Sequence, residues 1–146
     1  MPTSSSHPVQ NADVPRNAFS RPVVAVVEDN PSMLAALGRF LRAAGFDTVL
    51  HASAEDYLKN VPATCPTCMV VDVQLGGMSG LELQSRLLAQ KSNVPVIFIT
   101  AHDERATRLR AAALGCRGYL CKPFEGQQLL DLINLQEDAT QRAAQI

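Results

Sequence analysis

Short runs of apolar, mostly β-branched residues alternate with longer amphipathic segments along this chain, and this alternation constrains the fold more than any other feature. Continuous apolar runs of this length are typical of strands that are buried on both faces of a parallel sheet. Strands that alternate with helices predict such a sheet, joined by right-handed crossovers and covered by helices on both sides. The expected strands are residues 22–27, 47–51, 68–72, 95–100 and 118–121.

Helix start and stop signals lie between these strands. Asn30-Pro31 is typical of an N-cap followed by a first-turn proline, and Gly45 is placed to end that helix. Ser53 resembles another N-cap, and Ser79 and Glu82 have the spacing of a capping box. Further helices are expected over residues 32–44, 103–114 and 125–135. We therefore expect an α/β protein with a doubly wound five-stranded parallel sheet (flavodoxin-like, strand order 2-1-3-4-5) and five helices.

The composition fits one domain with a tail at each end. Of the 146 residues, 47% are hydrophobic and 18% charged, which suits a chain that folds without disulfides or metal. We expect a disordered leader over residues 1–20, the domain over 21–136 and a polar tail over 137–146. The net charge is −1 without a basic run, so no nucleic-acid partner is expected. No segment has the pattern of a membrane span or signal peptide, so the expected location is cytoplasmic.

Four cysteines could indicate a redox or metal site. Cys65 and Cys68 have CxxC spacing, and Cys116 and Cys121 lie far downstream. Cys68 falls in an apolar strand pattern, and no histidine accompanies the second pair. We expect ordinary reduced or buried thiols. Zinc or a disulfide is the alternative.

Polar residues follow four of the five expected strands. Glu28 and Asp29 end the first strand, Asp72 the third, Thr100 the fourth and Lys122 the fifth. Any one of them could be a local cap or turn residue. Because parallel strands present their carboxyl ends at the same edge of the sheet, the side chains should converge where ligands bind in such folds. The joint pattern therefore predicts a functional site with Asp72 at its centre.

The chemistry of these groups favours phosphoryl transfer. Like charges near 4 Å repel by about 4 kcal/mol per pair at an effective dielectric of 20, so three carboxylates need a counter-ion. Oxygen ligands in an open cleft favour Mg²⁺, which keeps waters and shares a phosphate. Lys122 supplies a compact positive charge and Thr100 a hydroxyl for phosphoryl oxygens. Asp72 would then be the nucleophile that becomes an aspartyl phosphate.

These motifs resemble those of the receiver domains of two-component response regulators. Residues 26–30 (VVEDN) resemble the acidic pair of that family, and residues 71–83 (VDVQLGGMSGLEL) its phosphoacceptor strand and loop. Thr100-Ala101 and residues 118–124 (GYLCKPF) complete the set. The resemblance is to CheY-like receivers, with a loop closest to the FixJ-type members, and it covers residues 22–135.

The resemblance implies a role for each residue of the site. Asp72 would accept a phosphoryl group from a sensor histidine kinase or a histidine phosphotransfer protein. Thr100 and Tyr119 would switch the face formed by the helix over 103–114, the strand over 118–121 and the last helix, which is also a possible homodimer interface. Lys122-Pro123 would be a cis peptide bond. The implied Mg²⁺ ligands are Asp29, Asp72, the backbone carbonyl of Gln74 and, through water, Glu28, while Thr100 and Lys122 would contact the phosphoryl oxygens.

Two other functions compete with this one. A haloacid-dehalogenase-type phosphatase needs a second Asp two residues after the nucleophile, where this chain has Gln74, so we expect no enzyme beyond autocatalysed phosphorylation and dephosphorylation of Asp72. A pseudo-receiver that acts as a constitutive interaction module is the other alternative. One departure from the family is visible, because Gly76-Gly77 stands where most relatives have Pro-Gly. We expect a more flexible loop there, and either a stand-alone receiver or part of a longer regulator.

Overall fold

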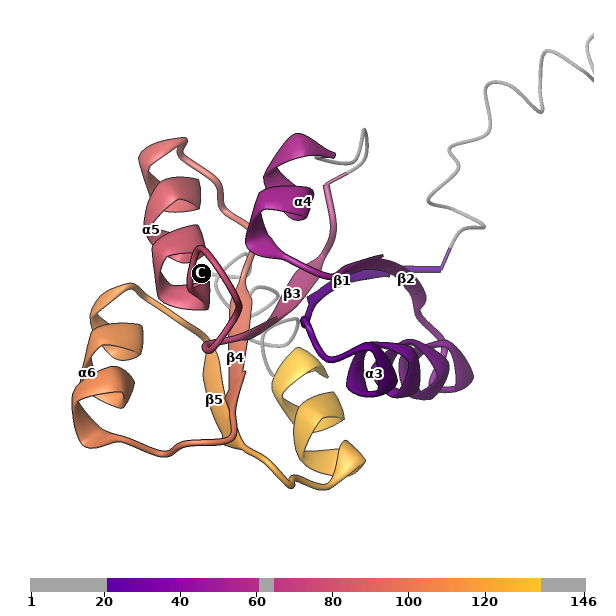
Figure 1. Ribbon diagram of the computed structural model, residues 1–146. Coiled ribbons are helices and arrows are strands. Elements are labelled where there is room, and N and C mark those ends of the chain that lie inside the picture. The colour runs from indigo at the N-terminus through magenta and orange to yellow at the C-terminus, as the bar shows by residue number, and fades with distance from the viewer. Residues whose placement is uncertain (1–20, 61–64, 135–146) are drawn as a thin grey trace, which may run out of the picture.

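A computed structural model describes residues 21–60 and 65–134, and the leader over 1–20 and the tail over 137–146 that the sequence predicts lie outside this part of the chain. Five strands alternate with helices along the described residues (Figure 1). The strands are β1 (Val23–Val27), β2 (Asp47–His51), β3 (Cys68–Asp72), β4 (Val96–Thr100) and β5 (Gly118–Cys121). The helices are α3 (Pro31–Ala43), α4 (Ala54–Lys59), α5 (Gly80–Ala89), α6 (Arg105–Ala113) and an unlabelled C-terminal helix over residues 126–134.

The five strands form one parallel sheet in the order β2-β1-β3-β4-β5. This confirms both the fold class and the strand order expected from the sequence. The register pairs Val27 with His51 and Val71, and Asp72 with Ile99, so the strands end together. The next residue of each strand therefore emerges at one edge of the sheet.

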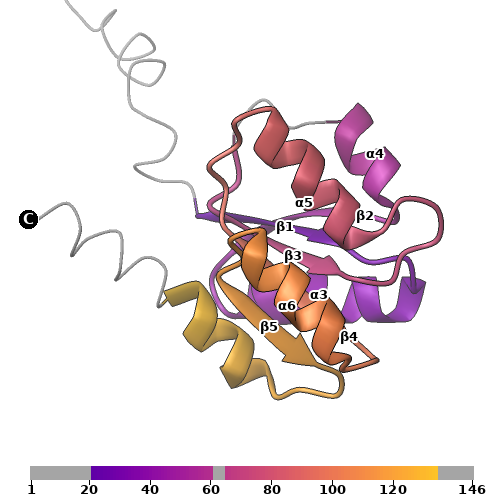
Figure 2. The ribbon, with the colours of Figure 1, turned by 90° about the vertical axis from the view of Figure 1, so that its left-hand side faces the viewer.

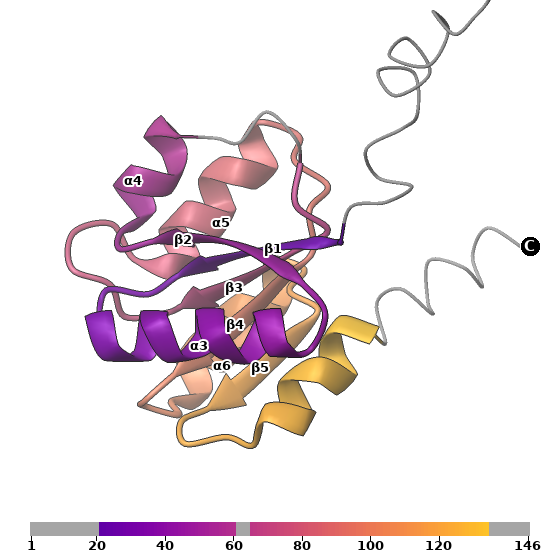
Figure 3. The same ribbon diagram turned by 90° about the vertical axis from the view of Figure 1, so that its right-hand side faces the viewer.

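Two hydrophobic cores lie on opposite faces of the sheet. Helices α4, α5 and α6 cover one face, while α3 and the C-terminal helix cover the other (Figures 2 and 3). Alternate residues of each strand point to each core, as the pleat of a strand requires: Val71 and Phe98 belong to the first core, and Val70 and Ile97 to the second. All five residues of β3 and of β4 are buried, as expected for central strands of a parallel sheet.

The helix signals in the sequence mostly act as expected. The Asn30 side chain accepts a hydrogen bond from the Met33 N–H, and Ser79 and Glu82 form a complete capping box. Gly45 has a φ of 109° and follows the end of α3. The fourth helix begins at Arg105 and not at Asp103, because residues 103 and 104 are still outside the helix and Glu104 is its extended N-cap.

No helix in the described part of the chain is long and apolar enough to cross a membrane.

Candidate functional site

The carboxyl ends of β1, β3, β4 and β5 bring the expected site residues together at one edge of the sheet. The side chains of Glu28, Asp29 and Asp72 each offer an oxygen, and these oxygens lie within 4.8 Å of one another. Glu28 and Asp72 are buried, with 1% and 4% of their surfaces exposed, whereas Asp29 is open to solvent. The site is therefore an acidic cluster with a buried floor and an exposed side.

Lys122 supplies the positive charge of the cluster. Its ammonium nitrogen lies 2.8 Å from Glu28 Oε1 and 2.7 Å from Asp72 Oδ2. The cis Lys122-Pro123 peptide bond confirms the expectation from the sequence. Burial acts to lower the pKa of Lys122, but the contacts with Asp72 and Glu28 outweigh it and raise that pKa above its ordinary value. The Lys122 ammonium group is therefore positively charged while it contacts the two carboxylates.

Glu28 is the most desolvated carboxyl group of the cluster. Its burial raises its pKa, and the negative charge of Asp72 adds to this shift, while Lys122 and the Asn30 N–H act in the opposite direction. The Asn30 N–H donates to Glu28 Oε2 at 3.0 Å, so both carboxylate oxygens have a partner. This arrangement fixes the orientation of a group that would be costly to bury alone.

Thr100 and Gln74 border Asp72 on the side of β4. The Gln74 N–H donates to Asp72 Oδ1 at 2.8 Å, and the fully buried Thr100 hydroxyl lies 3.2 Å from Gln74 Oε1 and 3.0 Å from the His102 carbonyl. Asp72 thus has one oxygen on a backbone amide and the other on Lys122.

Two carboxylates, one from the cluster and one from α4, hold the loop that follows Asp72. The Gly76 N–H donates to Asp29 Oδ2 at 3.0 Å, and the Met78 N–H donates to Glu55 Oε2 at 2.9 Å. The sequence pattern did not reveal Glu55, because an acidic residue in the first turn of a helix is common for reasons of the helix dipole alone. Only the packing of α4 beside the loop brings this carboxylate to the site.

Tyr119 lies on β5, where it pairs with Phe98 of β4, two register positions before Thr100 and its partner Cys121. Its hydroxyl is buried without a hydrogen-bond partner among the described residues. The Arg108 guanidinium lies 5.8 Å from the centre of the ring and is held by an ion pair with Asp103. The expected switch residue is therefore covered by a charged side chain of α6.

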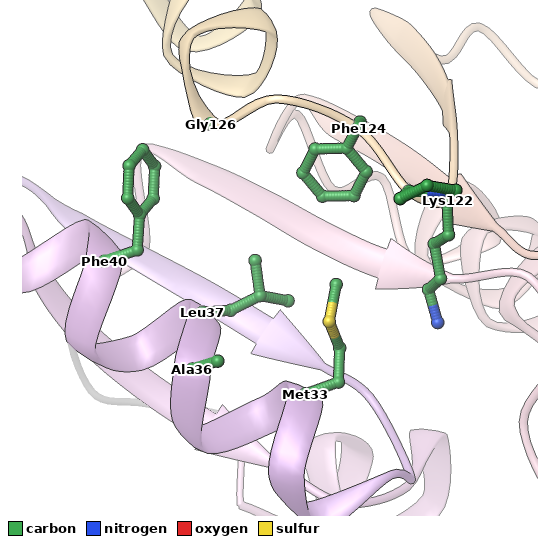
Figure 4. Close-up of a pocket in the computed structure, with 8 residues that line it drawn as sticks. Met33, Ala36, Leu37, Phe40, Lys122, Phe124 and Gly126 are labelled. Carbon is green, nitrogen blue, oxygen red and sulfur yellow. The ribbon is translucent and has the colours of Figure 1, made fainter.

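An apolar cavity of about 500 Å³ lies between α3 and the segment that follows β5. Figure 4 shows Met33, Leu37 and Phe40 of α3 facing the segment that carries Phe124 and Gly126. The side chain of Lys122 reaches this cavity and the acidic cluster at once, since its ammonium contacts Glu28 and Asp72. Nothing in the sequence pattern indicates this cavity.

The four cysteines do not form a disulfide. All are free, and burial raises the pKa of Cys68 to about 12, so it is an unreactive core thiol. This agrees with the expectation of ordinary thiols.

The residues of the cluster suit a hard divalent cation. Three carboxylates, two of them buried, provide only oxygen donors, and these converge within one coordination sphere. Asp29 is exposed, so the cluster is open to solvent on that side. The donor set thus fits Mg²⁺ and offers neither the thiolate nor the imidazole that zinc sites use.

Comparison with known proteins identifies relatives of the whole domain. Nodulation protein W of Bradyrhizobium diazoefficiens is 36% identical over 130 residues (88% of this chain and 57% of the relative). Transcriptional regulatory protein FixJ of the same species is 34% identical over 110 residues (75% of this chain and 54% of the relative). The chain therefore spans about half the length of these curated relatives.

Solved structures share both the fold and the sequence. Response regulator StyR superposes with a TM-score of 0.75 at 39% identity, covering 86% of this chain and 65% of the other. The structure named FixJ-N gives 0.72 at 31% identity, covering 77% and 90%. The family profile described as "Response regulator receiver domain" matches residues 24–134. On this evidence, the chain belongs to the response regulator receiver domain family.

Proposed function

We propose that Asp72 of this receiver domain takes a phosphoryl group from a phosphohistidine, with the help of Mg²⁺, and thereby controls the binding of a partner protein. Receiver domains of two-component systems act as phosphoacceptors and interact with histidine kinases. The observation that carries the proposal is the 2.7 Å contact between Lys122 Nζ and Asp72 Oδ2 inside a cluster of three carboxylates. Repulsion between three carboxylates destabilises the folded protein unless the cluster binds cations, and a bound cation can in turn bind a phosphate.

The transfer needs positioning and charge neutralisation more than covalent machinery. An oxygen of Asp72 attacks phosphorus, the new O–P bond forms as the P–N bond breaks, and the electron pair of that bond stays with the departing imidazole. Asp29 and Asp72 would hold Mg²⁺, with the backbone carbonyl of Gln74 and, through water, Glu28 contributing as the family resemblance implies, and the ion would supply positive charge next to the transferring oxygens. Lys122 exchanges its contact with Asp72 Oδ2 for a contact with the phosphoryl group.

Phosphorylation of Asp72 would change the conformation of Thr100 and Tyr119. A phosphoryl group on Asp72 offers the Thr100 hydroxyl a stronger acceptor than Gln74 Oε1 or the His102 carbonyl. Movement of Thr100 changes the space beside Tyr119, whose buried hydroxyl has no hydrogen-bond partner within residues 21–60 and 65–134. The resulting change would alter the face formed by α6, β5 and the C-terminal helix, where a partner or a second copy of the chain binds.

The proposed partner is a sensor histidine kinase or a histidine phosphotransfer protein. Turnover of other phosphate esters is not proposed, because Gln74 cannot serve as the general acid that a phosphatase would need at that position. A pseudo-receiver would not need a metal or a phosphate, so that alternative does not explain why Lys122, Thr100 and three carboxylates lie together.

Labelling with a small phosphodonor tests the proposal. Wild-type protein incubated with acetyl phosphate and Mg²⁺ should gain one phosphoryl group by intact-protein mass spectrometry, and Asp72→Asn and Asp72→Ala should gain none. Asp47→Asn is the matched control, because Asp47 is an exposed carboxylate at the opposite end of the sheet. Stoichiometric labelling of Asp72→Asn would overturn the assignment. Absence of labelling in the wild type, together with unchanged spectra in a Mg²⁺ titration, would favour the pseudo-receiver.

A further inference from the structure

The loop between Asp72 and α5 is closed at its base by backbone contacts. The Gly80 N–H donates to the Val73 carbonyl at 3.0 Å, and a Cβ added at Gly80 would lie 2.3 Å from the Asp72 carbonyl oxygen. These contacts fix the two ends of the loop but leave the residues between them to be held by other groups.

The tip of the loop is held from outside by α4. Glu55 Oε2 accepts the Met78 N–H at 2.9 Å. Gly77, with a φ of 80°, makes this approach possible, because a Cβ at that position would lie 2.7 Å from the same Glu55 oxygen. The bond to Met78 lowers the pKa of Glu55, and the positive charges of Arg86 and Lys59 act in the same direction. The carboxylate therefore stays ionised and able to accept.

The same loop also holds a carboxylate of the acidic cluster. The Gly76 N–H donates to Asp29 Oδ2 at 3.0 Å, and only a residue with a backbone N–H can make this bond. A proline at this position would lack this N–H. Carboxylates that bind metals are commonly oriented by such outer hydrogen bonds. The loop thus links α4 to Asp29, because its Met78 N–H bonds to Glu55 of α4 and its Gly76 N–H bonds to Asp29.

We propose that Glu55 is a positioning residue for the Asp72 site, which holds the β3–α5 loop so that the Gly76 N–H orients the Asp29 carboxylate toward the metal position. This rests on the proposed function, since it assigns Glu55 a role in building the cation site of the phosphoacceptor. Because Gly76 and Gly77 restrict the backbone little, the contacts of Glu55 and Asp29 are what hold this loop in place.

A Mg²⁺ titration of ¹⁵N-labelled protein tests the role of Glu55. Glu55→Ala should weaken Mg²⁺ binding by roughly threefold to tenfold, a smaller loss than buried outer ligands cause because this contact is exposed. Glu55→Gln keeps an acceptor oxygen and should restore most of the affinity. Glu104→Ala is the control for loss of a negative charge at the same edge of the sheet. The Glu104 carboxylate accepts a hydrogen bond from Thr107 of α6 and not from the β3–α5 loop. Glu104→Ala should bind Mg²⁺ as the wild type does.

The amide signals of Gly76 and Met78 separate a positioning role from a general loss of stability. In Glu55→Ala both signals should shift before Mg²⁺ is added, and the Met78 amide should lose the acid-range titration that follows the Glu55 carboxylate, while core amides such as that of Ile97 stay in place. Unchanged Mg²⁺ affinity in Glu55→Ala, with normal Mg²⁺ binding and labelling in the wild type, would overturn the role of Glu55 alone. A wild type that neither binds Mg²⁺ nor is labelled would instead overturn the proposed function.

Discussion

The two sides of the Asp72 site are built in different ways. The floor, consisting of Glu28, Asp72 and Lys122, is held by strand ends and by direct contacts between charged groups at 2.7 and 2.8 Å. The rim, consisting of Asp29, Gly76, Gly77, Met78 and Glu55, is held by single carboxylate–amide hydrogen bonds in solvent-exposed positions. Buried ion pairs respond strongly to the loss of one partner, whereas exposed contacts are individually weak. The floor should therefore determine whether the chemistry occurs, and the rim how tightly the metal is held.

The largest expected effect comes from removing the cation of the floor. Lys122→Met should lower the rate of acetyl phosphate labelling by roughly a hundredfold, because the developing charge on the phosphoryl oxygens loses its preorganised partner. The rate is measured by intact-protein mass spectrometry at saturating Mg²⁺. Lys91→Met, at an exposed position after α5, should label as the wild type does. A Lys122→Met protein that is labelled at the normal rate would show that the floor does not govern the chemistry.

Neutralising Glu28, the most buried carboxylate, should have opposite effects on the stability of the fold and on Mg²⁺ binding. Glu28→Gln should raise the free energy of unfolding by about 1 kcal/mol in Mg²⁺-free buffer at pH 7. Lys122 keeps Asp72 as its ion-pair partner in this variant, while the cost of burying a second carboxylate beside Asp72 is removed. The same variant should bind Mg²⁺ more weakly. Urea unfolding followed by circular dichroism measures the first effect, with Glu104→Gln as control.

The pH dependence of stability gives a second test of Glu28. Its pKa is raised in the folded protein, so the folded state holds this proton more tightly than the unfolded state. Wild-type stability should therefore fall as pH rises from the ordinary glutamate pKa to the raised one, and this contribution should be absent in Glu28→Gln. Parallel pH profiles of the two proteins would contradict the burial argument.

The strand ends explain why the floor could be predicted from the sequence. Parallel strands must place their last residues at one edge, so Glu28, Asp72 and Lys122 follow from the strand pattern alone. Glu55 could not be predicted in this way, because its contact depends on how α4 packs beside a loop more than twenty residues later. The sequence pattern predicts a start of α6 at Asp103, two residues too early, because it does not show that Asp103 lies before the helix and pairs from there with Arg108 of α6.

The two glycines of the rim should differ in their response to alanine substitution. Gly77→Ala should destabilise the fold by about 1–2 kcal/mol, because Gly77 has a left-handed φ and an added Cβ would meet Glu55. Gly76→Ala is the matched control, since its φ is not left-handed, its N–H is kept and its Cβ would lie 3.7 Å from Asp29 Oδ2. Urea unfolding of the two variants gives the comparison. Equal stabilities would show that the Glu55 contact does not constrain Gly77.

Chemical trapping of the phosphorylated residue shows directly whether Asp72 is the phosphoacceptor. Wild-type protein phosphorylated by acetyl phosphate in Mg²⁺ is treated with borohydride, which reduces an aspartyl phosphate to homoserine, and its peptides are sequenced by mass spectrometry. We predict homoserine at residue 72, only when both Mg²⁺ and the phosphodonor are present. Homoserine at another aspartate, or an acid-stable phosphate on a hydroxyl group, would contradict the account.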